Sequence, residues 1–274
     1  MRKQWQKKII TCVTALAMTV TIFPQSWLLK SEKAKAATRE PDITTDLIGY
    51  YTFDGSLANK ASVTGGKAIL HGGAGDTWNQ SATGTANYEN SKNGFGKAYH
   101  FLGDGNTRGE GLQLDAKVTG TDFTISFWVN PEDYGVATTS LVFANHDDSC
   151  FTINSLNDFR CSALLGKLWD WDNRGNNFVC LDGDNTENGK ASVGNWTMVT
   201  ITNKNGEQKL YFDGVEKTQG NNNSQNALVT EVLKNQEIFL GINYWDASFK
   251  GLMDEVRIYL NLGRILPLLI ERSE

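Results

Sequence analysis

The sequence is poor in the residues on which much enzyme chemistry depends. Only three histidines occur in 274 residues, which leaves little room for histidine-based catalysis. No serine nucleophile elbow and no histidine-rich metal motif is present. The sequence therefore gives no candidate catalytic residue, and binding becomes the first function to consider.

Cysteine is also scarce, and its spacing argues against zinc. Cys150, Cys161 and Cys180 lie beyond the N-terminal segment and lack the paired, closely spaced ligands of a zinc site. In an exported protein, three cysteines form one bridge plus a spare thiol, or no bridge. Cys150 and Cys161 flank an expected turn at 156–158, so a disulfide across that hairpin is one of the two alternatives.

No apolar run is long enough for a typical membrane-spanning helix. The run Ile9–Phe23 falls short of the roughly 20 residues that a bilayer requires. It follows a basic start and precedes the small-x-small sequence Ala34-Lys35-Ala36. This layout predicts a cleaved signal peptide over residues 1–36 and no stable membrane insertion afterwards. The alternative is an uncleaved anchor.

Positive charge is concentrated in this leader, and the rest of the chain is acidic. The formal net charge is −5, and residues 1–36 hold seven Lys or Arg against one Glu, which leaves −11 for the remainder. An acidic surface argues against nucleic acid and anionic membranes as partners. Neutral polysaccharides remain compatible with this charge.

Beyond a short linker at 37–45, short alternating segments separated by Gly, Asn and Asp predict an all-β fold. Asp213-Gly214 predicts a tight hairpin turn, and 229–233 is the one short helix considered. Twelve strands are expected, at 47–53, 98–102, 112–114, 123–129, 140–144, 150–154, 159–165, 178–181, 196–203, 208–212, 238–242 and 252–259. Even spacing of this kind is typical of a sandwich or jelly roll.

The segment 123–129 alternates Phe123, Ile125, Phe127 and Val129, which predicts one strand face in the core. Trp128 falls on the opposite face. It either lines a concave sheet where a sugar docks or lies covered by loops, which is the commoner fate of an aromatic side chain.

The last expected strand carries a carboxylate. Strand periodicity puts Asp254 on one face with Leu252, Val256 and Ile258, and predicts that it points to the apolar interior. A carboxylate there is costly unless a cation or several donors meet it. Asp254 is therefore interpreted as a metal ligand or as half of a buried pair. A second aspartate, Asp54, ends the first expected strand.

Six motifs occur in an order that resembles laminin-G-like domains of the concanavalin A-like lectin/glucanase superfamily. The resemblance covers about residues 46–259. The motifs are Tyr50-Tyr51-Thr52-Phe53-Asp54-Gly55-Ser56, Phe95-Gly96-Lys97-Ala98-Tyr99-His100-Phe101, Phe123-Thr124-Ile125-Ser126-Phe127-Trp128-Val129, Asn195-Trp196-Thr197-Met198-Val199, Lys209-Leu210-Tyr211-Phe212-Asp213-Gly214 and Gly251-Leu252-Met253-Asp254-Glu255-Val256-Arg257-Ile258-Tyr259.

This resemblance implies a two-sheet antiparallel jelly-roll sandwich, secreted by a bacterium and attached to glycoside hydrolases as a carbohydrate-binding module. It also implies a structural calcium ion held by the residues that match the family's metal-binding aspartates, Asp54 and Asp254. Calcium accepts hard oxygen ligands, backbone carbonyls among them, and would neutralise Asp254. The alternative is that Asp254 pairs with Arg257 or caps a loop amide.

Three polar and aromatic clusters follow strand ends, where the loops of a sandwich gather. Aromatic faces stack on sugars, and polar side chains bind the hydroxyls. The predicted ligand-binding residues are Trp169, Trp171, Asp172, Arg174, Asn243, Tyr244, Trp245, His146 and Asp147.

A glycoside hydrolase is the second function considered. The glutamate pair of retaining glycosidases on this scaffold is absent, and the pairs Asp170/Asp172 and Asp182/Asp184 lie in loop-like sequence. The tail 260–274 is unusually apolar. It either marks a truncation or frame change before a catalytic domain, or docks on the sandwich. A protein-adhesion domain is a third reading, which the acidic surface does not support.

Overall fold

A computed structural model of the chain describes residues 44–72, 85–103, 111–133, 139–144, 151–155, 161–165, 178–180, 193–204, 207–216, 233–244 and 248–260. All of them belong to the compact unit of residues 41–274. Within these ranges every regular element is a β-strand. None of the described segments forms a helix long and apolar enough to cross a membrane.

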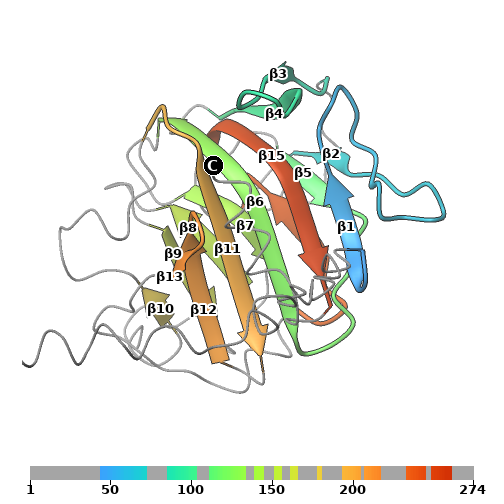
Figure 1. Cartoon of the computed structure of the whole chain (residues 1–274), viewed down its shortest axis with the longest axis vertical. Helices are drawn as coiled ribbons and strands as arrows, with labels where there is room; N and C mark the ends of the chain where they lie inside the picture. The colour runs from blue at the N-terminus through green and yellow to red at the C-terminus, as the bar shows by residue number, and fades with distance from the viewer. Residues whose placement is uncertain are drawn as a thin grey trace, which may run out of the picture. The chain divides into compact units, whose positions relative to one another are not determined.

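The first sheet has eight antiparallel strands. Seven of them follow the order β13-β12-β11-β6-β15-β4-β3, and β1 pairs with β15 (Figure 1). Its strands are β1 (Leu47–Tyr51), β3 (Tyr88–Asn90), β4 (Lys97–Leu102), β6 (Phe123–Asp133), β11 (Thr197–Lys204), β12 (Glu207–Phe212), β13 (Val215–Glu216) and β15 (Lys250–Tyr259).

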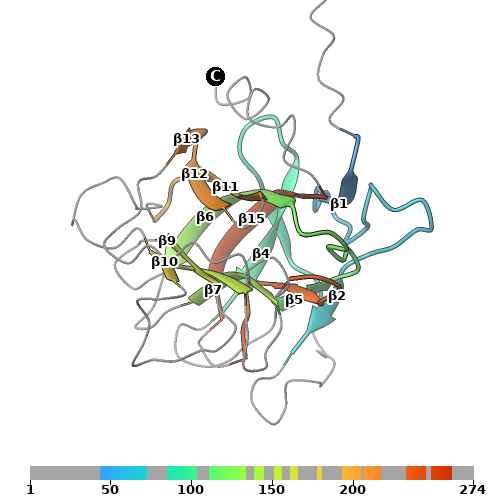
Figure 2. The same ribbon diagram turned by 90° about the horizontal axis from the view of Figure 1, so that it is seen from below.

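The second sheet has seven antiparallel strands in the order β10-β9-β8-β7-β14-β5-β2, and it lies beneath the first as a separate layer (Figure 2). Its strands are β2 (Ile69–His71), β5 (Gly111–Leu114), β7 (Thr139–Ala144), β8 (Phe151–Ser155), β9 (Cys161–Leu165), β10 (Phe178–Cys180) and β14 (Ile238–Leu240). Two stacked antiparallel sheets confirm the predicted sandwich.

The core lies between the two layers. Phe123, Ile125, Phe127 and Val129 are fully buried in one cluster with residues of both sheets, as their alternation predicts. Burial of each such side chain contributes about 1.5–3 kcal/mol relative to exposure. All twelve expected strands are present, and β13 is the second strand of the expected hairpin at Asp213-Gly214. β2 and β3 are additions that the sequence did not reveal.

The predicted hairpin at Asp213-Gly214 is confirmed. Phe212 pairs with Val215, so the loop has two residues, and both have positive φ angles of 49° and 78°. This geometry matches the right-handed twist of the flanking strands. Residue 233, at the end of the helix considered at 229–233, is described, and residues 229–232 lie outside the described ranges.

The outer face of the eight-stranded sheet carries a second, smaller cluster. Trp128, Met198 and Tyr259 are buried there and pack against Phe95 and Trp196, among others. Trp128 is 4% exposed, so it is covered rather than open. Of the two alternatives for this residue, the structure supports the covered tryptophan.

Candidate functional site

The candidate site lies where β15 changes partner along one edge. On that edge, β15 pairs with β4 over residues 250–253 and with β1 over residues 256–259. Asp254 and Glu255 fall between these two pairings, while β6 follows the opposite edge of the strand (Figure 1). The fork between β1 and β4 therefore opens beside two consecutive carboxylates.

A β-bulge in β15 sets the direction of these carboxylates. Asp254 pairs with Trp128, but Arg257 already pairs with Ser126, and Glu255 has a φ of 53°. The additional residue turns the following side chains to the other face of the sheet. Val256 accordingly lies in the inter-sheet core, whereas Asp254 shares the outer face with Trp128.

The predicted register of Asp254 was therefore wrong. The alternation was expected to place Leu252, Asp254, Val256 and Ile258 on one inward face, but the bulge at Glu255 separates the first two from the last two. Asp254 is nevertheless fully buried, on the outer side of the sheet. The carboxylate is therefore removed from water as predicted, but by burial on the outer face and not by the core between the sheets.

Asp254 is buried with hydrogen-bond donors but without a cation in the described part of the chain. The Ser91 hydroxyl donates to Oδ2 at 2.5 Å, and the Glu255 N–H donates to Oδ1 at 2.7 Å. Burial raises the pKa of Asp254 to about 7, and the nearby charges of Glu255 and Asp54 add to the increase. The site thus has an uncompensated negative charge when this carboxyl is ionised.

Arg257 does not neutralise Asp254. Its guanidinium contacts the Glu255 carboxylate and donates to the Tyr50 hydroxyl at 2.9 Å. The same guanidinium lies 4.3 Å from the centre of the Tyr50 ring. Of the alternatives for Asp254, pairing with Arg257 is not what the structure shows, while capping of a backbone amide is present at Glu255.

Asp54 lies at the other side of the fork, just after β1. Its side chain is 45% exposed, Oδ1 accepts the Lys97 N–H at 3.0 Å, and Oδ2 lies 3.7 Å from Lys60 Nζ. The Lys97 N–H is the main cause that lowers the pKa of Asp54. A Cβ at Gly96 would lie 2.1 Å from Asp54 Oδ1, so only glycine leaves this carboxylate in place.

One loop, residues 91–96 between β3 and β4, organises both aspartates. It begins at Ser91, which binds Asp254, and it ends next to Lys97, whose N–H binds Asp54. Lys92 Nζ lies 3.8 Å from the centre of the Trp128 ring, and Phe95 packs against the same ring at 6.1 Å. Trp128 therefore anchors the loop that positions the two carboxylates.

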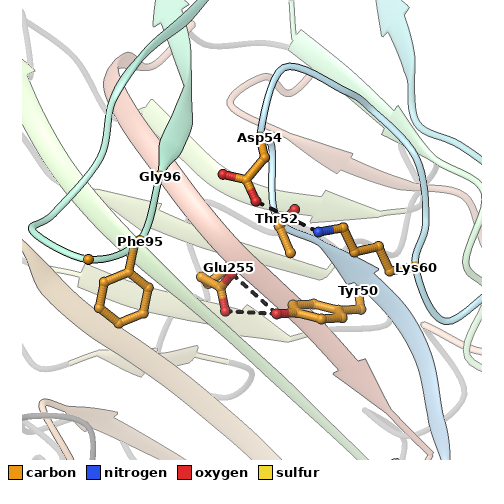
Figure 3. Close-up of a pocket in the computed structure, with 8 residues that line it drawn as sticks. Tyr50, Thr52, Asp54, Lys60, Phe95, Gly96 and Glu255 are labelled. Carbon is orange, nitrogen blue, oxygen red and sulfur yellow. Dashed lines mark hydrogen bonds and ion pairs between the residues drawn. The ribbon is translucent and has the colours of Figure 1, made fainter.

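A cavity of about 510 Å³ opens at the fork. Its lining includes Tyr50, Asp54, Lys60, Phe95 and Glu255. Figure 3 shows the Asp54–Lys60 pair near the end of β1, Glu255 hydrogen-bonded to Tyr50 beside it, and Phe95 facing them from the loop. The cavity thus combines two aromatic rings with groups that donate and accept hydrogen bonds.

The donor chemistry at the fork fits calcium better than zinc. The described residues contain no group of three or more His, Cys, Asp or Glu side chains that could hold a metal. Carboxylate oxygens are ligands that calcium accepts, and a calcium ion at the fork would need backbone carbonyls and water to complete its shell. Asp54 and Asp254 would supply the carboxylates.

The predicted ligand-binding loops are only partly described. Asn243 is 2% exposed, and its Nδ2 donates to Ser140 Oγ at 2.7 Å. Tyr244 is partly buried against a cluster of Phe143, Phe239 and Ile242. The other predicted residues lie outside the described ranges: His146, Asp147, Trp169, Trp171, Asp172, Arg174 and Trp245. For the cysteines, only the backbone positions of Cys161 and Cys180, in β9 and β10, are described.

Sequence reasoning missed several residues of the fork. Tyr50 and Lys60 lie near Asp54 in the sequence, and Glu255 is next to Asp254, whereas Ser91 lies far from both aspartates. The glycines at 94 and 96, which flank Phe95 with positive φ angles, were the available signal for a constrained loop.

A family model described as the concanavalin A-like lectin/glucanases superfamily matches residues 104–261. This chain belongs to that superfamily. The sandwich of two antiparallel sheets agrees with the assignment, and the predicted resemblance to this superfamily is confirmed. Four of the six motifs lie within the matched residues. Among proteins of curated function, no sequence matches the chain.

Several solved structures are similar to this superfamily member. Domain 4 of AbnA, an extracellular GH43 arabinanase from Geobacillus stearothermophilus solved with arabinotriose, is 26% identical, with a TM-score of 0.56. The match covers 84% of this chain and 98% of that domain.

Two binding domains are similar in fold alone. The receptor-binding domain of botulinum neurotoxin type G is 16% identical with a TM-score of 0.52, covering 83% of this chain and 50% of that one. The binding domain of Paraclostridial Mosquitocidal Protein 1 is also 16% identical, with a TM-score of 0.54 and coverages of 83% and 51%. The present chain spans about half the length of these domains.

Proposed function

We propose that this chain is a carbohydrate-binding module, exported by a bacterium and accessory to polysaccharide degradation. The observation that carries the proposal is the similarity over 98% of an arabinanase domain that was solved with arabinotriose. The basic, apolar and small-residue layout of residues 1–36 supports export. The acidic remainder is compatible with a neutral glycan as partner.

Aromatic loops are the proposed principal contacts. Trp169, Trp171 and Trp245 would stack on sugar rings, while Asp172 and Arg174 would bind hydroxyl groups. Shallow sugar sites of this kind bind in the millimolar to micromolar range, which corresponds to roughly −4 to −8 kcal/mol. Tryptophans in loops are costly to expose, so a ligand is a physical reason for their presence.

Calcium is the proposed cofactor, with Asp54 and Asp254 as its carboxylate ligands. The buried Asp254 carboxylate, which has no cation in the described part of the chain, supports this proposal. A bound divalent cation would offset the charge of both aspartates and link β1 to β15. Its role is thus structural.

Calorimetric titration of residues 37–274 with arabinotriose, in calcium and in chelator, tests the function. We expect binding in calcium that weakens strongly when Trp169 and Trp171 are both replaced by alanine. Unchanged binding by this variant would refute the aromatic site. Release of reducing ends from arabinan by the wild-type chain would instead favour the hydrolase alternative.

A further inference from the structure

The cavity at the fork of β1 and β4 lies on the outer face of the eight-stranded sheet and is lined by hydrogen-bonded and ion-paired side chains. Its volume of about 510 Å³ falls within the range of about 300–1,000 Å³ that small-molecule sites occupy. Of the predicted ligand-binding residues, the two that the structure describes, Asn243 and Tyr244, do not line it.

An exposed donor and an exposed acceptor lie side by side at its rim. Lys60 Nζ and Asp54 Oδ2 are 3.7 Å apart, and their side chains are 50% and 45% exposed. A hydroxyl group can accept from an ammonium and donate to a carboxylate at the same time. Two neighbouring hydroxyls of a sugar ring match such a pair. An exposed ion pair contributes little to stability, so a sugar that separates Lys60 from Asp54 costs the fold little.

The inner wall of the cavity is held in place before any ligand arrives. The Tyr50 hydroxyl donates to the Glu255 carboxylate at about 3.1 Å, and it accepts from Arg257 at 2.9 Å. On the opposite side, Phe95 is fixed against Trp128. A preformed wall lowers the entropic cost of binding because few side chains must become ordered.

The charge of the lining distinguishes between classes of sugar. Asp54 forms an ion pair with Lys60, and the Glu255 carboxylate contacts the Arg257 guanidinium, so the charges at the cavity offset one another. A uronate or a sulfated sugar therefore gains no net electrostatic attraction there. A neutral sugar does not depend on such attraction, because hydrogen bonds would hold it.

We propose that this cavity is a subsite for a neutral saccharide, in which Asp54 and Lys60 bind neighbouring hydroxyls between the Tyr50 and Phe95 rings. The inference rests on the proposed function, which it deepens by adding a second contact region at the β1–β4 fork. A carboxylate offers about four lone-pair positions, so Asp54 can serve both a cation and a sugar.

The test compares two lysines that form exposed ion pairs. Lys60→Met removes the donor at the cavity, and Lys209→Met removes the equivalent partner of Glu216 on the β12–β13 hairpin, at 3.3 Å. Both variants and the wild type are titrated with arabinotriose, xylotriose and galacturonotriose at a fixed calcium concentration. Amide spectra of the wild type are recorded with each sugar, with attention to Gly94 and Gly96 at the cavity.

We expect Lys60→Met to lose about tenfold in affinity for a neutral trisaccharide, the loss of one charge-assisted hydrogen bond, while Lys209→Met binds as the wild type does. The Gly94 and Gly96 amide signals should shift with that sugar. Wild-type binding with an unaffected Lys60→Met variant and unshifted glycines would overturn the subsite but leave the proposed function. Tighter binding of galacturonotriose would overturn the neutral class. No binding by the wild type would remove both proposals.

Discussion

Replacement of Asp254 by asparagine removes the negative charge of this residue but keeps its hydrogen bonds. Asparagine keeps the shape of the side chain, and its oxygen can still accept the Glu255 N–H. Its amide group can donate to the Ser91 hydroxyl, which then acts as acceptor instead of donor. The substitution therefore removes the charge without leaving a buried polar group unpaired.

The size of the effect follows from the pKa of Asp254. Burial raises this pKa from 3.8 to about 7. A difference of about three between the pKa values of the folded and unfolded states corresponds to about 4 kcal/mol. Above pH 7, the ionised carboxyl lowers the free energy of unfolding of the metal-free protein by this amount. In chelator at pH 8, Asp254→Asn is expected to be more stable than the wild type by up to this amount.

Calcium should reduce the difference in stability between the two proteins. A cation that binds only the folded state at 100 times its Kd stabilises that state by about 2.7 kcal/mol. The wild type should gain this stability, and the variant, which lacks one of the two carboxylate ligands, should gain little. Urea unfolding followed by tryptophan fluorescence, in calcium and in chelator, measures all four free energies of unfolding.

Two results would refute this reasoning. If Asp254→Asn is clearly less stable than the wild type in chelator at pH 8, the buried carboxylate is not a burden on the metal-free fold. If calcium leaves the wild-type unfolding curve unchanged, the fork does not hold calcium under these conditions.

Three further outcomes follow from the same site. In chelator, the contribution of Asp254 to stability is fully present below pH 3.8 and is lost as the pH rises through about 7, because the folded state raises the pKa of this residue. Urea unfolding of the wild type and Asp254→Asn across this range should therefore show a difference in the free energy of unfolding that grows with pH and then levels off. Gly96→Ala should weaken the increase in unfolding temperature that calcium causes, because the new Cβ displaces Asp54. Gly55→Ala is the control: Gly55 has a similar φ of 71° and open space where the Cβ would lie, so this variant should keep the increase. Equal increases in both variants would contradict the role of Gly96. Trp128→Ala should cost about 3–5 kcal/mol in urea unfolding and speed the hydrogen exchange of the Lys97 amide, and an unchanged exchange rate would show that Trp128 does not anchor the loop.

Much of the fold could be predicted from the sequence because local patterns dictate it. The alternation in 123–129 defines one strand and its buried face, and Asp213-Gly214 defines a turn because both residues tolerate a positive φ. Short strands such as β2 and β3 carry too few residues for a period to emerge, so they were missed.

The fork was less predictable because it depends on a bulge and on contacts between distant segments. A bulge at Glu255 adds one residue to β15, and no periodic pattern signals it in advance. The contact of Ser91 with Asp254 joins residues 163 positions apart. Asp54 and Asp254 were identified from their motifs, whereas Lys60 and Ser91 needed the structure.

Binding of glycans by the isolated chain is the most direct test of the account. Residues 37–274 should be applied to a glycan array in calcium and again in chelator, with folding checked by the unfolding temperature in each buffer. We expect binding to neutral plant-type or host oligosaccharides in calcium, with a lower unfolding temperature in chelator. A folded, calcium-loaded chain that binds no glycan on the array would contradict the assignment as a carbohydrate-binding module.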